Sequence, residues 1–418
     1  MEKLRVHSGH KLFGELKICS SKNSLLPIIA GSILCDENVT LKSVPNFLDI
    51  TKMLEVLCSL GVNISRFEND VFINSKNADK FFVSHELGKD IRGSIIILGA
   101  LLSKFKRAIV SYPGGCNIGS RPIDLHIAGL KALGVKITEE HGYLYCNGEN
   151  IHPTTFQFES QSVGATENMI LASVFLKGKT VLKNCAKEPE IVDLARFMNS
   201  MGAKIYGAGT SVITIYGVDK LQHVTYTAIG DRIVAGTYLV AAAIAGGKVE
   251  LKNVNPQFLQ NPIKKLKYCG CDISLKNDSI KISAGKQCYA LRQITTGVYP
   301  KFPTDLQSVF LSLMAVSKGA TYIYEKLFNG RFNQVPDLIK MGAKIQSNCN
   351  FAKVVGVEKL SGADVVAPDL RAGASLVLAG LNADGYTTIE NVNLIDRGYD
   401  HIEKELSILG AEIERIDL

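Results

Sequence analysis

The chain has 418 residues, of which 46% are hydrophobic and 21% charged, and its formal net charge is +7. This composition excludes a disordered or fibrous protein and predicts two or more globular domains, since single cores stop growing near about 250–300 residues. The apolar runs are too short to cross a bilayer, and the ten cysteines lack the clustered spacing of a zinc site or disulfide framework, so we expect a cytoplasmic protein that binds no metal and no membrane.

A five-residue motif recurs six times along the chain. Its glycines lie 73, 68, 68, 72 and 68 residues apart. Each copy is typical of a helix end, a glycine in the left-handed conformation and a following strand. The spacing therefore predicts a six-fold internal repeat. The motif glycines are Gly61, Gly134, Gly202, Gly270, Gly342 and Gly410.

Each repeat is also expected to contain an apolar helix followed by a short strand. The helices are apolar on nearly all sides, so they must be buried. The predicted fold class is therefore α/β (α+β), with two inside-out α/β barrel domains of three repeats each, in which sheets surround buried helices. The expected helix and strand pairs are Ser24–Leu34 with Val39–Val44, Gly93–Leu102 with Ala108–Tyr112, Ala165–Leu176 with Thr180–Asn184, Ile233–Ala245 with Lys248–Val254, Leu306–Val316 with Thr321–Glu325, and Gly373–Leu381 with Tyr386–Val392.

The repeats divide most simply into two domains of three. The first domain is predicted at residues 22–229, and the second at residues 1–21 and 230–418, with a seam at Tyr226–Gly230. The strand-like stretch 1–21 is free to pair with the second domain. This arrangement predicts two chain crossings and a hinge.

The loop after the second predicted strand is longer than the repeat requires. From strand end to motif glycine takes about 15–18 residues in five repeats and 21 in the second, with the surplus in Gly114–Ser120. Cys116 follows two glycines, and Arg121 lies five residues on. A flexible backbone beside a cation favours an accessible, activated thiol, although many cysteines are simply small buried residues.

Two loop-to-helix junctions have features of anion sites. Pro122 suits a first helical position, and Arg121 beside it favours a phosphate or carboxylate, whereas a surface arginine with a capping Asp124 is the simpler alternative. The turn Ser162–Gly164 opens the third buried helix and exposes backbone N–H groups, which is a weak signal alone. His126, one turn into the helix after Pro122, is as compatible with a structural role as with a functional one.

Ionisable residues begin four of the predicted buried helices. Thr304 and Gln307 have the spacing of a capping box, so Asp305 and Asp369 can be explained by the helix dipole. Cations at this end require an anionic ligand or a paired carboxylate instead. These cations are Lys22, Arg92 and Arg371.

On these residues the chain resembles the enolpyruvyl transferase family, and among its members those that act on UDP-N-acetylglucosamine. The similarity runs from Leu4 to Ile413. The resemblance implies two domains that close over substrates. It also implies transfer of the enolpyruvyl group of phosphoenolpyruvate to the sugar 3′-hydroxyl with release of phosphate, the first committed step of peptidoglycan synthesis, in a monomer without a cofactor. The strongest stretches are Pro113–Leu133, Ser162–Thr166, Glu188–Ile205, Asp231–Ala243, Phe302–Gln307, Arg331–Ile345 and Ala367–Ile413.

The resemblance also implies roles for individual residues. Cys116 is the general acid, able to form a covalent adduct, and Asp305 is the general base, with Lys22 and Arg397 completing the catalytic set. Lys22, Asn23, Arg121 and Arg397 bind phosphoenolpyruvate, and Arg331, Asp369 and Arg371 support the closed state. The implied contacts to the sugar nucleotide are Asn23, Arg92, Arg121, Pro122, Ile123, Asp124, Leu125, Ser162, Val163, Gly164, Asp305 and Leu327.

Two other functions stay open. Ser160 stands where the family usually has a lysine, which leaves room for a sibling transferase with another hydroxyl acceptor. A six-repeat clamp on nucleic acid is the second alternative, but it needs basic residues on one lining face, and no basic run of five occurs. We therefore expect small-molecule substrates and no nucleic acid.

Overall fold

The computed structural model of the chain describes residues 2–88, 95–112, 123–285 and 287–417. These residues form two compact units, each with its own core. The first unit contains the described residues of Ser20–Gly115 and Arg121–Ile229, and the second those of Met1–Cys19 and Gly230–Leu418. Within the described ranges, no helix combines the length and apolar character needed to cross a bilayer.

The described residues of each unit form three four-stranded sheets with one shared topology. In every sheet a parallel edge strand is followed by three strands paired antiparallel. In the first unit the sheet orders are β14(Val224–Thr227)-β3(Asn38–Lys42)-β5(Asp70–Asn74)-β4(Asn63–Phe67), β6(Phe82–Val83)-β7(Arg107–Ser111)-β9(Tyr143–Asn147)-β8(Lys136–Glu140) and β10(Thr155–Gln157)-β11(Lys179–Lys183)-β13(Val212–Tyr216)-β12(Lys204–Tyr206).

The second unit repeats this plan. The orders of its sheets are β2(Leu12–Lys17)-β15(Gly247–Lys252)-β17(Ser279–Ala284)-β16(Asp272–Leu275), β18(Gln293–Thr295)-β19(Ala320–Tyr324)-β21(Phe351–Val355)-β20(Lys344–Ser347) and β23(Asp364–Val366)-β25(Tyr386–Glu390)-β1(Glu2–His7)-β26(Glu412–Asp417). A short pair, β22(Leu360–Ser361) and β24(Ala383–Asp384), lies beside them.

Strands distant in sequence complete both units. β1 pairs with β25 and β26, with Leu4 opposite Ile389 and Arg415, and β2 runs parallel to β15. This confirms the prediction that the N-terminal stretch pairs with the C-terminal half of the chain. In the first unit, β14 supplies the edge strand of the first repeat in the same way. Each unit therefore closes on itself.

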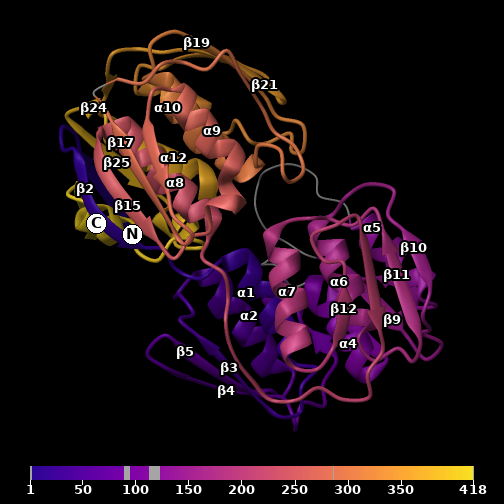
Figure 1. Cartoon of the computed structure of the whole chain (residues 1–418). Helices are drawn as coiled ribbons and strands as arrows, with labels where there is room; N and C mark the ends of the chain where they lie inside the picture. Colours follow the sequence, from indigo (N-terminus) through magenta and orange to yellow (C-terminus); the bar gives the residue numbers. More distant parts are fainter. Residues whose placement is uncertain (1, 89–94, 113–122, 286, 418) are drawn as a thin grey trace. The chain divides into compact units, whose positions relative to one another are not determined.

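One buried helix per repeat fills the centre of each unit, and nearly all of its residues are inaccessible to solvent. Figure 1 shows these helices inside the surrounding sheets of each unit. The inside-out α/β fold predicted from the apolar helix pattern is thus confirmed. The central helices are α1(Lys22–Ser32), α4(Ile97–Phe105) and α6(Val163–Ser173) in the first unit, and α8(Arg232–Ala245), α10(Gln307–Ala315) and α12(Leu370–Gly380) in the second.

A second set of helices leads into the motif glycines. All six of these glycines have φ between +89° and +99°, which confirms the predicted left-handed caps. The set consists of α2(Leu48–Ser59), α5(Asp124–Ala132), α7(Pro189–Ser200), α9(Gln260–Tyr268), α11(Val335–Lys340) and α14(Ile402–Ile408). Shorter helical segments are α3(His85–Gly88), α13(Val392–Ile395), η2(Pro256–Leu259) and η3(Thr304–Leu306).

Candidate functional site

The sequence-predicted site residues fall into a described and an undescribed set. Arg92, Cys116, Arg121 and Pro122, together with the surplus loop Gly114–Ser120, lie outside the described residues. Many of the other predicted residues lie at the N-terminal ends of central helices in each unit, and the rest lie in the adjoining loops or at the start of α5.

Lys22 is the first residue of α1 in the first unit. The Ser21 side chain caps this helix by accepting a hydrogen bond from the Ser24 N–H at 3.4 Å, so Asn23 lies within the first turn. The Lys22 Nζ lies 2.8 Å from Asp49 Oδ2 of α2, and both side chains are about nine-tenths buried. Of the two explanations for a cation at this helix end, the paired carboxylate is present. Asp49 was missed in the sequence because it lies on a different helix.

The turn before α6 is a capped helix start. Ser162 Oγ accepts from the Ala165 N–H at 3.3 Å, and Thr166 Oγ1 donates to the Ser162 carbonyl at 2.7 Å. Val163 and Gly164 therefore present first-turn N–H groups, which have no acceptor within their own helix. Such a turn is suited to bind a phosphate oxygen.

The described residues after the Cys116 loop lead into an outer helix. α5 begins at Asp124, with Ile123 in the N-cap position and no side-chain cap. Pro122, which the sequence predicted for the first helical position, lies outside the described residues. Ile123 is buried, Leu125 is half-buried and Asp124 is exposed. Ile123 precedes α5, the other two residues begin it, and α5 packs on α6.

Asp305 forms the centre of the cluster in the second unit. Its Oδ1 accepts from Arg331 Nη2 at 2.6 Å, and Arg371 Nε lies 3.9 Å from the same oxygen. The Asp305 side chain keeps 28% of its surface exposed, whereas Arg331 and Arg371 are almost fully buried. A carboxylate that is held by hydrogen bonds and keeps part of its surface exposed can accept a proton from a bound hydroxyl.

The predicted capping box at Thr304 and Gln307 is absent. Thr304 Oγ1 donates to Glu325 Oε2 at 2.9 Å, and α10 has no side-chain cap. The buried Glu325 also accepts from Thr296 Oγ1 and from the backbone N–H groups of Leu327 and Phe328. Glu325 thus joins the turn bearing Leu327 to the residue preceding Asp305. Asp305 lies in the first turn of η3, where the helix dipole favours a carboxylate, and it is also paired with Arg331.

Asp369 and Arg371 begin α12. Asp369 Oδ1 accepts from the N–H groups of Arg371 and Ala372 at 2.9 and 3.0 Å, so Asp369 is an N-cap, as the dipole explanation predicts. The Arg371 guanidinium donates to Tyr399 Oη at 3.2 Å. Burial disfavours its charge, but Tyr399, Asp305 and Asp231 outweigh burial and raise the pKa of Arg371.

Arg397 lies in a loop that is held on both sides. Asp396 accepts two hydrogen bonds from Arg415, at 2.8 and 2.9 Å. Tyr399, which is 1% exposed, shares its Oη with Thr237 Oγ1 at 2.8 Å and with Arg371. The half-buried Arg397 therefore sits between two anchors.

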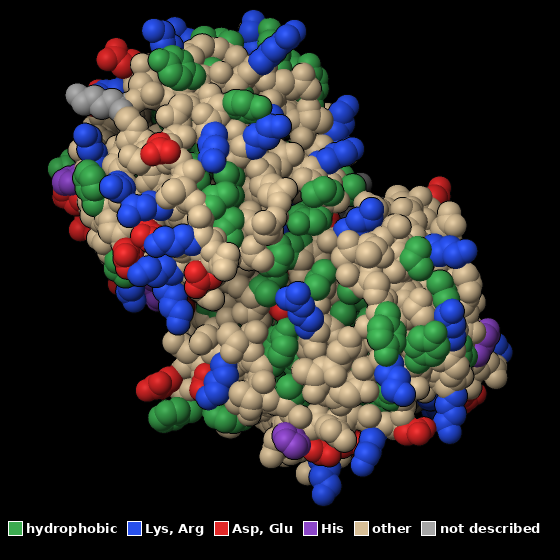
Figure 2. All heavy atoms as spheres, viewed as in Figure 1, with side chains coloured by type: hydrophobic (Ala, Val, Ile, Leu, Met, Phe, Trp, Pro, Cys, Tyr) green, Lys and Arg blue, Asp and Glu red, His purple; other side chains and the backbone are tan. Residues whose placement is uncertain are grey.

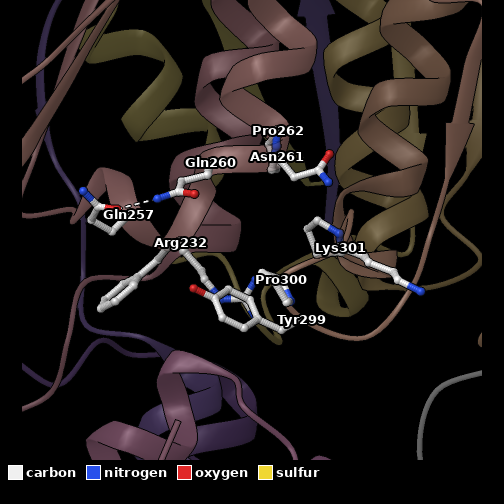
Figure 3. Close-up of a pocket in the computed structure, with 10 residues that line it drawn as sticks. Arg232, Gln257, Gln260, Asn261, Pro262, Tyr299, Pro300 and Lys301 are labelled. Atoms are coloured by element: carbon white, nitrogen blue, oxygen red, sulfur yellow. Dashed lines mark hydrogen bonds between the residues drawn. The ribbon is translucent and has the colours of Figure 1, made fainter. Parts of the chain in front are cut away.

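A small cavity lies beside the start of α8 in the second unit. Figure 3 shows Arg232, Tyr299 and Lys301 in its wall, and the Arg232 guanidinium lies 5.7 Å from the centroid of the Tyr299 ring. Its volume of about 20 Å³ gives room for roughly one water molecule. This cavity cannot contain a sugar nucleotide, and we do not assign the site to it.

The sequence of the chain matches the profile of the EPSP synthase (3-phosphoshikimate 1-carboxyvinyltransferase) family over residues 6–406. It is 43% identical, over 100% of both chains, to UDP-N-acetylglucosamine 1-carboxyvinyltransferase 2 of Caldanaerobacter subterraneus subsp. tengcongensis. It is 45% and 46% identical, again over 100% of both chains, to the UDP-N-acetylglucosamine 1-carboxyvinyltransferases of Desulforapulum autotrophicum and Ruthia magnifica subsp. Calyptogena magnifica.

Solved structures share the fold at low sequence identity. The enolpyruvyl transferase NikO from Streptomyces tendae has a TM-score of 0.88 at 22% identity, covering 99% of this chain and 98% of its own. EPSP synthase from Acinetobacter baumannii has a TM-score of 0.76 at 18% identity, covering 100% of both chains. At these identities the likeness establishes the architecture alone.

Proposed function

This chain belongs to the enolpyruvyl transferase family, and we propose that it transfers the enolpyruvyl group of phosphoenolpyruvate to the 3′-hydroxyl of UDP-N-acetylglucosamine, with release of phosphate. Family membership makes it a transferase. The observation that carries the proposed acceptor is the 43–46% identity, over the full chain, to relatives named for this reaction.

In the proposed addition step, Cys116 donates its proton to the methylene carbon of phosphoenolpyruvate. The sugar hydroxyl oxygen attacks the neighbouring carbon, and Asp305 accepts the hydroxyl proton. The hydrogen bond from Arg331 supports this role, because it orients a carboxylate whose side chain keeps 28% of its surface exposed.

In the elimination step, the carbon–oxygen bond to phosphate breaks with its electrons going to phosphate. A proton passes from the new methyl group to the Cys116 thiolate, which restores the vinyl group and the thiol. Expulsion of phosphate is favoured by cations already in place. We assign Lys22, Arg121 and Arg397 to the phosphate and carboxylate of phosphoenolpyruvate, with Asn23 beside Lys22. The burial of Lys22 against Asp49 supports this assignment, since a fixed ammonium loses little freedom on binding.

We assign the sugar nucleotide to Arg92, to the segment from Arg121 to Leu125, to the capped turn Ser162–Gly164, and to Leu327. Asp369 supports the site as the cap of α12, and Arg371 through its contact with Tyr399. We propose that the reaction serves peptidoglycan synthesis and takes place in the cytoplasm.

The test of the proposed acid is Cys116→Ser. The variant is expected to fold and to lose phosphate release by about 10²–10⁴-fold, the range contributed by a positioned acid. The exposed Cys349 offers a matched control, and Cys349→Ser should remain active. Full activity in Cys116→Ser would show that Cys116 is not the general acid.

The same pair of variants tests thiol modification. Fosfomycin, an epoxide phosphonate, is expected to inactivate the wild type and Cys349→Ser by alkylating Cys116. Cys116→Ser should not take up the reagent, as measured by the intact mass. Labelling at another cysteine would contradict the assignment.

The charge distribution supports small substrates over nucleic acid. In Figure 2, Lys and Arg side chains are scattered over the visible face with Asp and Glu among them. A clamp requires a continuous basic lining. Lys22, Arg331 and Arg371 are instead engaged with Asp49, Asp305 and Tyr399.

A further inference from the structure

The amide of Asn168 joins three helices of the first unit. Asn168 lies on α6, has no exposed surface, and contacts α4 and α5 through its side chain. α5 follows the Cys116 loop in sequence, α4 follows the segment with Arg92, and α6 begins at the Ser162–Gly164 turn. Figure 1 shows the three helices within the first unit.

The hydrogen bonds fix the orientation of this amide. Oδ1 of Asn168 accepts from the Gly99 N–H at 2.6 Å, so this end must be oxygen. Nδ2 donates to the carbonyl of Ile95 at 2.8 Å and lies 2.8 Å from His126 Nδ1. Since Nδ2 carries only hydrogens toward the ring, His126 Nδ1 must accept, and the proton of the neutral imidazole belongs on Nε2.

The opposite edge of the His126 ring lies against the first turn of α6. A Cβ placed on Gly164 would sit 3.1 Å from His126 Cε1 and 3.3 Å from Nε2. Any residue larger than glycine at position 164 would displace the ring from this position. A Cβ on Gly99 of α4 would lie 2.2 Å from the Asn168 backbone oxygen. The close approach of α4 to α6 therefore also requires a glycine.

We propose that Asn168 is a positioning residue that holds His126 in the Nε2–H tautomer, with the Nε2 edge against the turn Ser162–Gly164. Resting on the proposed function, this assigns His126 to the nucleotide side of the site. The ring shapes the first turn of α6 and gives it a neutral donor edge.

The tautomer is tested without substrate. Full-length protein labelled with ¹⁵N-histidine is examined by long-range ¹H–¹⁵N correlation NMR at about pH 8, where ordinary histidines are neutral. The His126→Gln variant identifies the signals of His126. The expected wild-type pattern is Nε2–H. Asn168→Asp, which replaces the donor with an acceptor, is expected to convert it to Nδ1–H or to the imidazolium.

The matched control is Ser173→Ala on the same helix. Ser173 is 1% exposed and donates only to the Met169 carbonyl, at 2.7 Å, among the hydrogen bonds of the described residues. This variant should keep the Nε2–H pattern. An Nδ1–H pattern in the wild type, or an unchanged pattern in Asn168→Asp, would overturn the proposal. If Asn168→Asp does not fold, the wild-type pattern decides alone.

The proposed link between His126 and the nucleotide is tested by steady-state kinetics. Asn168→Asp is expected to raise KM for UDP-N-acetylglucosamine by about tenfold, the effect of one lost hydrogen bond, with a smaller change in kcat. Ser173→Ala should leave both unchanged. A converted tautomer with unchanged KM would refute the link to the nucleotide. Because the NMR needs no turnover, failure of the proposed reaction is distinguishable from failure of the tautomer assignment.

Discussion

A buried carboxylate partner is the residue-scale feature that most constrains the proposed site. Lys22 lies where a helix dipole disfavours a cation, yet its ammonium contacts Asp49 at 2.8 Å in a nearly dry environment. Asp49 therefore compensates the charge before substrate arrives. This makes Lys22 a fixed cation rather than a mobile surface group.

Asp49→Asn is predicted to destabilise the first unit by on the order of 3 kcal/mol, because removal of one partner leaves the other charge buried and poorly compensated. Denaturant unfolding measures the change. KM for phosphoenolpyruvate should rise as well, since the Lys22 side chain loses its orientation.

The control lies on the same helix. Glu55 pairs with Lys52 at 2.9 Å, but both side chains are partly exposed, so Glu55→Gln should cost less than about 0.5 kcal/mol. Equal losses of unfolding free energy in the two variants would mean that burial of the Lys22–Asp49 pair contributes nothing to stability.

The sequence predicted the charged residues of the site but not their partners. Lys22 and Arg371 were identified because a cation at a helix start is unusual, whereas the role of Asp305 came from the resemblance. Asp49 and Tyr399 were not identified, since they lie 27 and 28 residues from the groups they contact, on other elements. Pairing over such separations depends on how the repeats pack, and no local pattern encodes it.

Element boundaries were predicted more closely, because each is set by local chemistry. The six motif glycines all adopt positive φ, as their position before a strand indicated. Helix starts shifted where caps lay elsewhere: α12 begins at Leu370 because Asp369 caps it, three residues before the expected start. The apolar pattern predicted the buried body of each helix but not its cap.

At the scale of elements, two motif glycines with the same conformation differ in surroundings. Gly134 has φ +94° and Gly202 +99°, but a Cβ on Gly134 would lie 2.6 Å from the Asn150 carbonyl, whereas a Cβ on Gly202 meets nothing within 4 Å. Gly202→Ala should therefore cost only the backbone strain, about 1–2 kcal/mol.

Gly134→Ala is predicted to cost more than Gly202→Ala, since its clash adds to the same strain. Thermal unfolding of both variants checks the order. The reverse order, or equal losses, would contradict the argument that packing at α5 depends on this glycine.

The loop of Arg397 is an element positioned by its neighbours. Tyr399→Phe keeps the buried ring but removes the hydroxyl that contacts Thr237 and Arg371. We predict that kcat/KM for phosphoenolpyruvate falls about tenfold, as expected for one lost buried hydrogen bond, while KM for the sugar nucleotide stays within about twofold.

Tyr386→Phe is the corresponding control, because Tyr386 is 60% exposed on β25. Its kinetics should match the wild type. If Tyr399→Phe also matches the wild type, the hydroxyl network does not position Arg397.

At the scale of the whole molecule, one partly buried acid should make stability depend on pH. Burial raises the pKa of Glu405 to about 7, and Asp400, Asp231 and Glu403 add to this, although the hydrogen bond from Tyr238 opposes it. The ordinary value is 4.5. The folded state thus retains a proton that the unfolded chain loses, so stability should fall as pH rises from about 4.5 to 7 and then level off.

Glu405→Gln is predicted to remove this fall, a gain relative to wild type on the order of 3 kcal/mol between pH 4.5 and 7.5. Urea unfolding at a series of pH values measures it. Glu414→Gln, at a mostly exposed position, should leave the wild-type curve unchanged. Parallel curves for Glu405→Gln and wild type would show that Glu405 does not titrate in this range.

For the molecule as a whole, we propose that the hydroxyl acceptor is a sugar nucleotide rather than another compound. Ser160 replaces a cation that the resemblance led us to expect, so the identity of the acceptor is the property to test. The most direct measurement is phosphate release from phosphoenolpyruvate with UDP-N-acetylglucosamine or with shikimate 3-phosphate. We predict release only with UDP-N-acetylglucosamine, in equal amount with a 3′-enolpyruvyl product; no release with it, or equal release with shikimate 3-phosphate, would contradict the account.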